Sequence, residues 1–264
     1  MIRSPQMTVM VDAVMKAARG LRRDFGEVEQ LQVSRKGPGD FVSNADHKAE
    51  KVLHEALLKA RPDYGFVMEE SGVVEGKDKA HRWHIDPLHG TINFLHGIPH
   101  FCVSLALERE GVIVAGVVYD PIKDELFIAE RGKGAFLNNR RIRVAGRDRV
   151  ADAVFATGIP TLGRAHHQEF QGLLGKVMAQ CSGVRRFGSA ALDLAYVAAG
   201  RYDGYWERGL NSWDIAAGAL LVKEAGGFVG DMNGADFTPE TRDVVCGNEA
   251  MHKALLAMVK LPTP

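Results

Sequence analysis

The sequence has few cysteines, no excess of either charge and no long apolar run. Its 264 residues include only three cysteines, Cys102, Cys181 and Cys246, which are far apart and stand among apolar residues. Such an odd, dispersed set indicates reduced thiols in the core and argues against disulfides or zinc ligands. Lysine and arginine together number 33, as do aspartate and glutamate. No overall field would therefore attract nucleic acid or an anionic membrane surface.

No stretch reaches the roughly 20 apolar residues that a membrane-spanning helix requires. Residues 1–25 instead place apolar side chains at helical spacing, interrupted by Asp12, Lys16 and Arg19. This pattern predicts an amphipathic surface helix. It lacks the continuous apolar segment of a signal peptide, so we expect a cytoplasmic protein.

Residues 1–145 have the pattern of an α+β unit. A second helix is expected to begin after Ser43, which opens a Ser-x-x-Asp sequence, and to end before Pro62. Apolar runs bounded by turn residues predict strands at 64–68, 82–85, 101–107, 112–119 and 125–129. The first two strands would deliver carboxylates at their C-terminal ends, because Glu69 and Asp86 follow them directly.

Residues 146–264 have a different pattern, in which short strands alternate with helices. That alternation is typical of an α/β half with crossover connections. Strands are expected at 154–157 and 184–187, and helices at 189–199 and 213–225. The last of these helices should end at Gly226, since glycine readily adopts the left-handed conformation of a helix C-cap.

The segment from Asp86 to Phe94 carries the most informative motif. A strand is expected to end at Asp86, Pro87 would stiffen the turn, and Gly90 and Thr91 would open the next element. Free backbone N–H groups at such a helix start can hold a phosphate. Taken alone, however, an Asp-Pro turn is common and indicates no particular function.

Two further carboxylates make a metal site a plausible interpretation. Asp214 is expected at a helix start, where a lone acidic residue is ordinarily explained by the helix dipole. Together with Glu69 and Asp86 it would supply hard oxygen ligands from three separate element ends. Mg²⁺ sites usually recruit carboxylates in this way and leave room for water and phosphate.

Four motifs in order make the chain resemble the inositol monophosphatase family, in particular its bacterial extragenic-suppressor (SuhB-like) branch. The family pattern consists of a Glu-Glu pair, Asp-Pro-x-Asp-Gly-Thr-x-Asn-Phe, Gly-Ser-Ala-Ala-Leu, and Trp-Asp-x-Ala-Ala-Gly ahead of Glu-Ala-Gly-Gly. The matching residues are 69–70, 86–94, 188–192, 213–218 and 224–227. Each motif is weak evidence alone, but four in order are specific. The resemblance covers nearly the whole chain and implies the layered αβαβα sandwich of the inositol monophosphatase and fructose-1,6-bisphosphatase superfamily.

The resemblance also implies a role for each matching residue. The metal ligands would be Glu69, Asp86, Asp214, the backbone carbonyl of Leu88 and the residue at position 89, here His89. Thr91 and Glu69 would orient the attacking water, and the N–H groups of Gly90 and Thr91 would hold the phosphate. The pocket for the alcohol part of the substrate would be formed by Gly188, Ser189, Ala190, Glu207 and Asn211.

The chain departs from the family pattern at position 89, where His89 replaces an aspartate, and at Ile92, which replaces a threonine. A neutral imidazole offers one lone pair to a metal and no negative charge, so it cannot reproduce a bridging carboxylate. Three interpretations follow: a less active enzyme, a site that favours Mn²⁺ or Zn²⁺, or a protein in which phosphatase chemistry is secondary. His84, His96 and His100 match no zinc motif and are expected at the surface or the pocket rim.

The function that the resemblance implies is Mg²⁺-dependent hydrolysis of myo-inositol monophosphate, or of a similar small phosphomonoester, by a metal-activated water. A fructose-1,6-bisphosphatase or a nucleotide-phosphate phosphatase is the nearest enzymatic alternative. A regulatory protein that binds the transcription machinery is the alternative of a different class. The family further implies a homodimer and inhibition by lithium. The metal site would lie between the halves 1–145 and 146–264.

Overall fold

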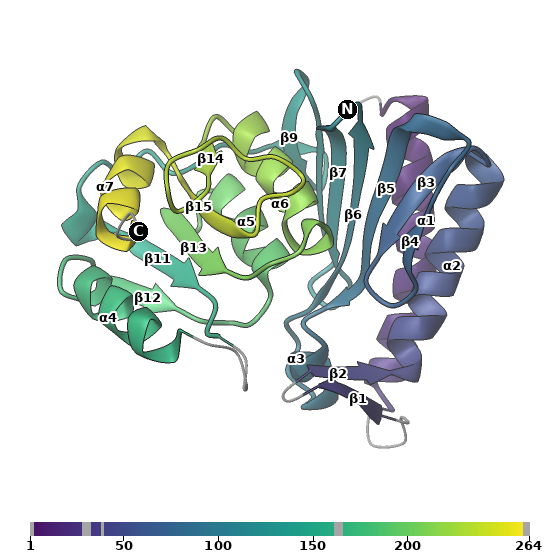
Figure 1. Cartoon of the computed structure of the whole chain (residues 1–264), viewed down its shortest axis with the longest axis horizontal. Helices are drawn as coiled ribbons and strands as arrows, with labels where there is room; N and C mark the ends of the chain where they lie inside the picture. The colour runs from purple at the N-terminus through teal and green to yellow at the C-terminus, as the bar shows by residue number, and fades with distance from the viewer. Residues whose placement is uncertain (1–2, 28–32, 38–39, 161–165, 261–264) are drawn as a thin grey trace.

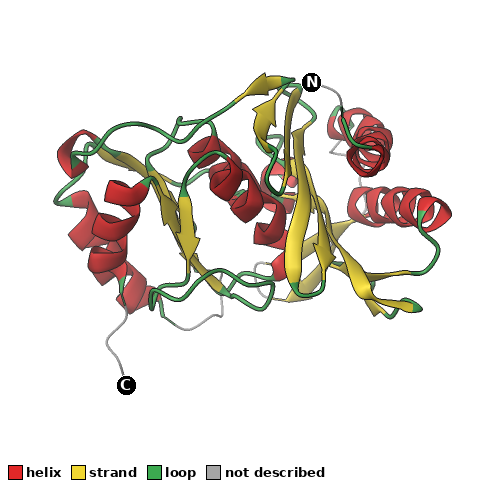
Figure 2. Cartoon of the chain, turned by 90° about the horizontal axis from the view of Figure 1, so that it is seen from above, coloured by secondary structure: helices red, strands yellow, loops and turns green. Residues whose placement is uncertain are grey.

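The computed structural model describes residues 3–27, 33–37, 40–160 and 166–260. In these residues, three layers of helices alternate with the two larger β-sheets (Figures 1 and 2). The helices α5 (Ala190–Ala198) and α6 (Ser212–Glu224) lie between these two sheets, whereas α1 (Pro5–Phe25) with α2 (Asn44–Ala60) and α4 (His167–Met178) with α7 (Glu249–Val259) cover their outer faces. This is the αβαβα arrangement that the sequence predicted.

The outer layer on one side consists of α1 (Pro5–Phe25) and α2 (Asn44–Ala60). Ser4 caps α1 by accepting a hydrogen bond from Met7 N at 3.1 Å, and Ser43 with Asp46 forms the predicted capping box of α2. A hairpin of β1 (Val33–Gly37) and β2 (Asp40–Ser43) precedes α2. Residues 38–39, between these two strands in the sequence, lie outside the described part.

The larger sheet has eight strands in the order β10-β9-β8-β7-β6-β5-β3-β4. In chain order these are β3 (Tyr64–Met68), β4 (Gly72–Val74), β5 (Asp78–His89), β6 (Cys102–Arg109), β7 (Val112–Asp120), β8 (Glu125–Glu130), β9 (Gly134–Leu137) and β10 (Arg140–Arg141). β5 pairs parallel with β3 and antiparallel with β6. The strands expected at 101–107, 112–119 and 125–129 correspond to β6, β7 and β8, which pair antiparallel.

β5 is longer at both ends than the sequence suggested. The strand does not stop at Asp86 but continues through Pro87 to His89, with a break in its register to β6 between Asp86 and His89. Pro87 is tolerated there because the irregular register frees the strand from ladder hydrogen bonds that a proline could not donate. Gly90 then turns the chain, and the short helix α3 (Thr91–Leu95) follows.

Alternation along β5 divides its side chains between two apolar cores. Successive residues of a strand point to opposite faces. Trp83 and Ile85 accordingly belong to the core beneath α1 and α2. His84 and Asp86 have the opposite parity and point to the other face of the sheet, which packs against α6. The strand thus places a histidine and an aspartate side by side at the centre of the molecule.

The smaller sheet has five strands in the order β12-β11-β13-β15-β14. These are β11 (Val154–Thr157), β12 (Gly183–Arg185), β13 (Gly204–Arg208), β14 (Phe228–Gly230) and β15 (Asp243–Gly247), and a 3₁₀ turn, η2 (Val150–Asp152), precedes them. Crossover connections account for the two parallel pairs of β11, whereas β13, β15 and β14 pair antiparallel. The outer helices of this sheet are α4 (His167–Met178) and α7 (Glu249–Val259).

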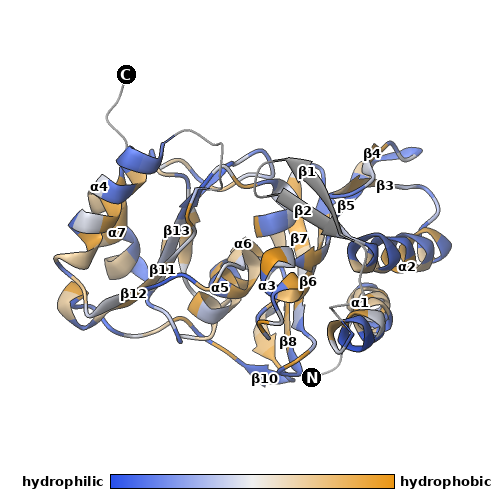
Figure 3. Cartoon of the chain, turned by 90° about the horizontal axis from the view of Figure 1, so that it is seen from below, coloured by the Kyte–Doolittle hydropathy of each residue, from blue (hydrophilic) through white to orange (hydrophobic). Residues whose placement is uncertain are grey.

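The central layer consists of α5 (Ala190–Ala198) and α6 (Ser212–Glu224), which lie between the sheets. Every residue of α5 is buried, and both helices are mainly apolar in Figure 3, whereas α2 shows a hydrophilic surface. α6 approaches β7 so closely that a Cβ on Gly116 would lie 3.0 Å from the backbone of Ala217. Gly226 ends α6 with a φ of +86°, as predicted.

All three cysteines are free; Cys102 and Cys246 are buried, whereas Cys181 is only half-buried. No helix among the described residues is both long and apolar enough to cross a membrane.

Candidate metal and phosphate site

The edge of the larger sheet brings two carboxylates together. β3 and β5 run parallel, with Met68 beside Ile85, so the residues that follow Met68 and Ile85 emerge at the same edge. Glu69 N donates a hydrogen bond to Ile85 O at 3.2 Å, and the side chains of Glu69 and Asp86 interact by a hydrogen bond.

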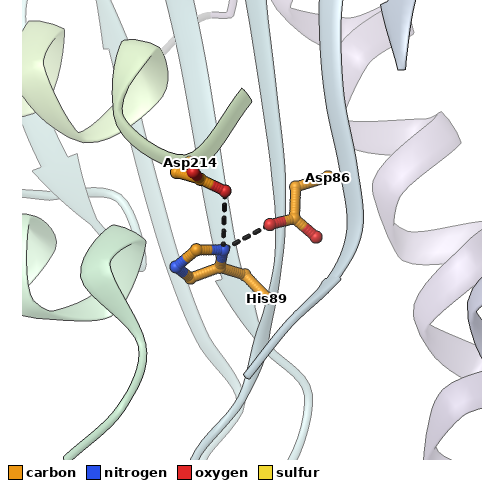
Figure 4. A group of neighbouring side chains, drawn as sticks. All are labelled: Asp86, His89 and Asp214. Carbon is orange, nitrogen blue, oxygen red and sulfur yellow. Dashed lines mark hydrogen bonds and ion pairs between the residues drawn. The ribbon is translucent and has the colours of Figure 1, made fainter. Parts of the chain in front are cut away.

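The third carboxylate comes from the other half of the chain. Asp214 occupies the first turn of α6, where its Oδ2 accepts a hydrogen bond from Asn211 N at 2.6 Å. Ligand atoms of Asp86, His89 and Asp214 all lie within 4.8 Å of one another. Figure 4 shows the imidazole of His89 pointing at both aspartates. Its Nδ1 contacts Asp86 Oδ2 directly and lies 3.5 Å from Asp214 Oδ1.

The electrostatics of this group favour a bound cation. Burial raises the pKa of Asp86 well above its usual range, and the nearby charge of Asp214 raises it further. A divalent cation would relieve both effects, because it neutralises the carboxylates that burial destabilises. The oxygens of Glu69, Asp86 and Asp214 suit a hard cation such as Mg²⁺, whereas the nitrogen of His89 suits borderline metals better. The donor set therefore fits a divalent cation and differs from an all-oxygen site.

The Thr91 hydroxyl joins this group to α2. Thr91 Oγ1 lies 3.1 Å from Asp46 Oδ1 and 3.0 Å from the carbonyl oxygen of Leu88, and can donate to either. Asp46 is buried, and burial raises the pKa of its carboxyl. Gly90, which precedes Thr91, has a φ of +107°, and a Cβ at this position would lie 3.2 Å from His100 O. The turn therefore requires glycine on both conformational and steric grounds.

A cavity of about 200 Å³ opens above these residues. It is lined by Glu69, Asp86, Leu88, His89, Gly90, Thr91, Ile92, Asn93, Gly158, Ile159, Arg186, Gly188, Ala190, Glu207, Leu210 and Asp214. The cavity thus joins residues from the larger sheet, the smaller sheet and the central helices.

Glu207 gives the cavity a second acidic wall. It lies near the end of β13, where burial raises its pKa to about 7, and it accepts a short hydrogen bond from the Tyr205 hydroxyl. A Cβ on Gly158 would lie 1.9 Å from the Glu207 carboxylate. Any side chain at position 158 would therefore displace the Glu207 carboxylate from its position beside the cavity.

Two of the predicted pocket residues, Ser189 and Asn211, are absent from the described lining of the cavity. Ser189 is buried, and its hydroxyl donates to O of the lining residue His89 at 3.2 Å. Asn211 caps α6, and its N–H donates to the lining residue Asp214. The roles of Ser189 and Asn211 as substrate contacts stay predictions.

Asp46 and Arg186 also belong to the surroundings of the site, although no motif in the sequence indicated them. Asp46 was interpreted only as part of a helix start, and its contact with Thr91 spans 45 positions, so no local pattern could reveal it. Arg186 is exposed at the cavity rim beside Gly188. A basic residue two positions before the Gly-Ser-Ala-Ala motif was the one available signal for it.

The expectation that His84 and His100 lie at the surface or rim is wrong, since both are buried. His84 alternates with Trp83 and Ile85 on a central strand, so either parity buries it between the sheet and a layer of helices. His100 packs against Phe187 and Tyr196. His96 is exposed, as expected.

Known proteins resemble this chain over nearly its full length. The model of the inositol monophosphatase family matches residues 3–261. An inositol-1-monophosphatase of Mesorhizobium japonicum is 63% identical over 99% of this chain and 98% of its own length. Nus factor SuhB of Escherichia coli is 43% identical over 97% of this chain and 96% of its own length. The crystal structure of extragenic suppressor protein suhB from Bartonella henselae has a TM-score of 0.95 at 56% identity, and the match covers 98% of this chain and 100% of that chain.

Proposed function

The chain belongs to the inositol monophosphatase family, and from this premise we propose that it hydrolyses myo-inositol monophosphate or a similar small phosphomonoester. The proposal is supported above all by the convergence of Asp86, His89 and Asp214, whose ligand atoms lie within 4.8 Å of one another. The relative that is 63% identical is named an inositol-1-monophosphatase. The products would be the free alcohol and inorganic phosphate.

The residues proposed to hold the metal are Glu69, Asp86, His89, Asp214 and the carbonyl oxygen of Leu88. Mg²⁺ is the proposed cation, and Mn²⁺ or Zn²⁺ is an alternative because His89 contributes nitrogen in place of oxygen. When bound, such a cation acidifies a water molecule and stabilises the charge that develops on the phosphate and the leaving oxygen.

Thr91 and Glu69 are proposed to orient the attacking water. Since the Thr91 hydroxyl uses its one O–H to donate a hydrogen bond to Asp46 or Leu88 O, its lone pairs remain available to accept a hydrogen bond from water. Glu69 faces the same cavity and offers a carboxylate as a second acceptor. Water held by two acceptors would present its own lone pair to the phosphorus. The N–H groups of Gly90 and Thr91 are proposed to hold the phosphate oxygens.

The alcohol part of the substrate is proposed to lie against the opposite wall of the cavity, at Gly188, Ser189, Ala190, Glu207 and Asn211. Glu207 can accept hydrogen bonds from polyol hydroxyls when it is ionised. Its pKa of about 7 leaves a large protonated fraction near neutral pH, so it can also donate one. A side chain that can both accept and donate hydrogen bonds suits a hydroxyl-rich substrate.

In our proposal residues 1–145 and 146–264 form two halves. The first carries most of the metal ligands, and the second carries Asp214 and the substrate wall. We further propose that the protein is a homodimer and that lithium inhibits it, as in the family to which it belongs. A regulatory role is the second candidate function, supported by the 43% identity to a relative named Nus factor SuhB.

A phosphate-release assay tests the substrate class. We expect the highest kcat/KM with inositol 1-phosphate or glycerol 2-phosphate, compared with fructose 1,6-bisphosphate and 2′-AMP, and with Mg²⁺, Mn²⁺ or Zn²⁺ in turn. A preference for the bisphosphate or the nucleotide would replace the proposed substrate by the corresponding enzymatic alternative. No release with any substrate and metal would favour the regulatory role.

A further inference from the structure

A chain of hydrogen bonds crosses from the larger sheet to the start of α6. Glu108 Oε2 on β6 lies 2.8 Å from His84 Nε2 on β5, and His84 Nδ1 lies 2.8 Å from Ser212 Oγ, in the first turn of α6. The side chain of His84 is only 4% exposed. Both ring nitrogens of this buried histidine are therefore satisfied, and one of them links two elements that are 128 positions apart.

The direction of the hydrogen bonds follows from the charge of Glu108. Its pKa is lowered chiefly by the hydrogen bond from His84, which indicates an ionised carboxylate that accepts a hydrogen bond from His84 Nε2–H. In a neutral ring Nδ1 then carries no proton and accepts a hydrogen bond from the Ser212 hydroxyl. The ionised Glu108 thus fixes the ring tautomer in which His84 Nδ1 can accept a hydrogen bond from Ser212. The hydrogen bond at one ring nitrogen commonly sets the tautomer of a histidine in this way.

These hydrogen bonds lie beside two of the candidate metal ligands, Asp86 and Asp214. His84 and Asp86 are two residues apart on β5 and point to the same face. Ser212 and Asp214 occupy the same first turn of α6. The contact between His84 and Ser212 therefore joins the two segments that carry Asp86 and Asp214. A second contact lies close to it, because Ser104 Oγ on β6 donates to Trp213 O at 3.0 Å.

A serine, a histidine and a carboxylate in hydrogen-bond contact also resemble a nucleophilic triad. The position of Ser212 argues against that interpretation, since Ser212 is absent from the described residues that line the substrate cavity. A nucleophile has to reach the substrate, whereas a residue that acts through position does not. Polar side chains that hold ligand-bearing segments in place commonly affect metal affinity by about 10- to 100-fold.

We propose that Glu108, His84 and Ser212 are positioning residues that fix the first turn of α6 against β5 and so set the separation of Asp86 and Asp214 for the cation. The inference rests on the proposed function, because it assumes that these two aspartates hold a metal. It adds three residues outside the cavity, from β5, β6 and α6, as determinants of metal affinity.

The test is Mn²⁺ binding, measured by calorimetry on the full chain without substrate. We expect Ser212→Ala to weaken Mn²⁺ binding by about tenfold, and Ser212→Thr, which keeps the hydroxyl, to restore affinity to within about twofold. His84→Phe should weaken binding to a similar degree. The double variant should bind no more weakly than either single variant, because both remove the same contact.

His81 provides a matched control on the same strand. Its Nδ1 pairs with Asp78 Oδ2 at 2.7 Å, and its ring stacks on Tyr64, so His81→Phe removes a histidine–carboxylate pair at the far end of β5. We expect its Mn²⁺ affinity to equal that of the unsubstituted protein.

Three outcomes would overturn the inference. One is equal Mn²⁺ affinity in Ser212→Ala and the unsubstituted protein. Another is a loss of affinity in Ser212→Ala that Ser212→Thr does not restore, because the hydroxyl would then not be the determinant. The third is an equal loss in His81→Phe. Absence of Mn²⁺ binding by the unsubstituted protein would instead contradict the proposed function itself, and this inference with it.

Discussion

Nδ1 of His89 lies 3.5 Å from Oδ1 of Asp214. The same nitrogen contacts the buried Asp86, so the imidazole lies between two carboxylates that would otherwise face one another. A metal that binds both aspartates has to displace this nitrogen or coordinate it. His89 is therefore the residue at which the site of this chain differs most from an all-carboxylate site.

Replacement of His89 by aspartate should raise Mg²⁺-dependent turnover. The variant would hold four carboxylates in place of three, and its fourth could bridge two cations as imidazole cannot. We expect kcat with Mg²⁺ to rise by at least about tenfold, which corresponds to roughly 1.4 kcal/mol of barrier. The gain should be smaller with Mn²⁺, which tolerates the nitrogen ligand better.

The matched control for this variant is His96→Asp, since His96 is exposed and lies only seven positions further along the chain. Its turnover and Mg²⁺ affinity should not change. If His89→Asp also left both quantities unchanged, position 89 would not be a metal position.

Removal of the Thr91 hydroxyl should slow the chemical step and leave metal binding intact. Thr91→Val keeps the shape of the side chain but cannot donate to Asp46 or accept from water. We expect kcat to fall by about 10²-fold or more, within the range typical of a lost group that assists proton transfer. Calorimetry should give Mn²⁺ affinity within about threefold of the unsubstituted protein. An unchanged kcat would remove Thr91 from the proposed mechanism.

His100 should make the fold less stable in acid. Burial lowers the pKa of His100 from 6.5 to about 4, and its Nε2 has no hydrogen-bond partner among the described residues. At a pH between about 4 and 6.5, His100 is protonated in the unfolded chain and neutral in the folded chain. The free energy of unfolding is therefore not reduced by His100 above about pH 6.5, and it decreases as the pH falls towards 4. The total loss would be up to roughly 3 kcal/mol.

His100→Phe should reduce this pH dependence, because phenylalanine keeps the ring contacts with Phe187 and Tyr196 and cannot be protonated. Urea unfolding at pH 7.5 and pH 5 measures the difference in the free energy of unfolding. The difference should be smaller in His100→Phe than in the unsubstituted protein, and unaltered in His96→Phe. Equal differences in all three proteins would show that His100 is protonated with an ordinary pKa.

The helices and strands around the site could be predicted because local signals define them. Capping residues located the start of α2, glycine located the end of α6, and apolar runs located β3, β6, β7 and β8. The length of β5 could not be predicted, because Pro87 is an ordinary stop signal. It lies inside the strand only because the register to β6 breaks there.

The acidic ligand candidates could be predicted as residues, but their surroundings could not. Glu69 follows β3, Asp214 lies in the first turn of α6, and Asp86 lies inside β5 just before the turn signal of Pro87. The order of the motifs joined these three residues. The contacts of Thr91 with Asp46 and of His84 with Ser212 join segments 45 and 128 positions apart. Only tertiary packing creates such pairs, so the sequence predicted His84 at the surface or the pocket rim, although it is buried where β5 packs against α6.

Phosphate release from inositol 1-phosphate, measured with Mg²⁺ and with EDTA, tests whether the protein is a metal-dependent phosphatase that uses Asp214. Asp214→Asn keeps an oxygen that can accept the capping hydrogen bond from Asn211 N, so we expect it to fold. Glu249→Gln, which removes an acidic residue from the first turn of α7, serves as its control. We expect phosphate release by the unsubstituted protein and by Glu249→Gln with Mg²⁺ but not with EDTA, and no release by Asp214→Asn. Full activity in EDTA, or unchanged activity in Asp214→Asn, would show that the reaction does not depend on a metal held by Asp214.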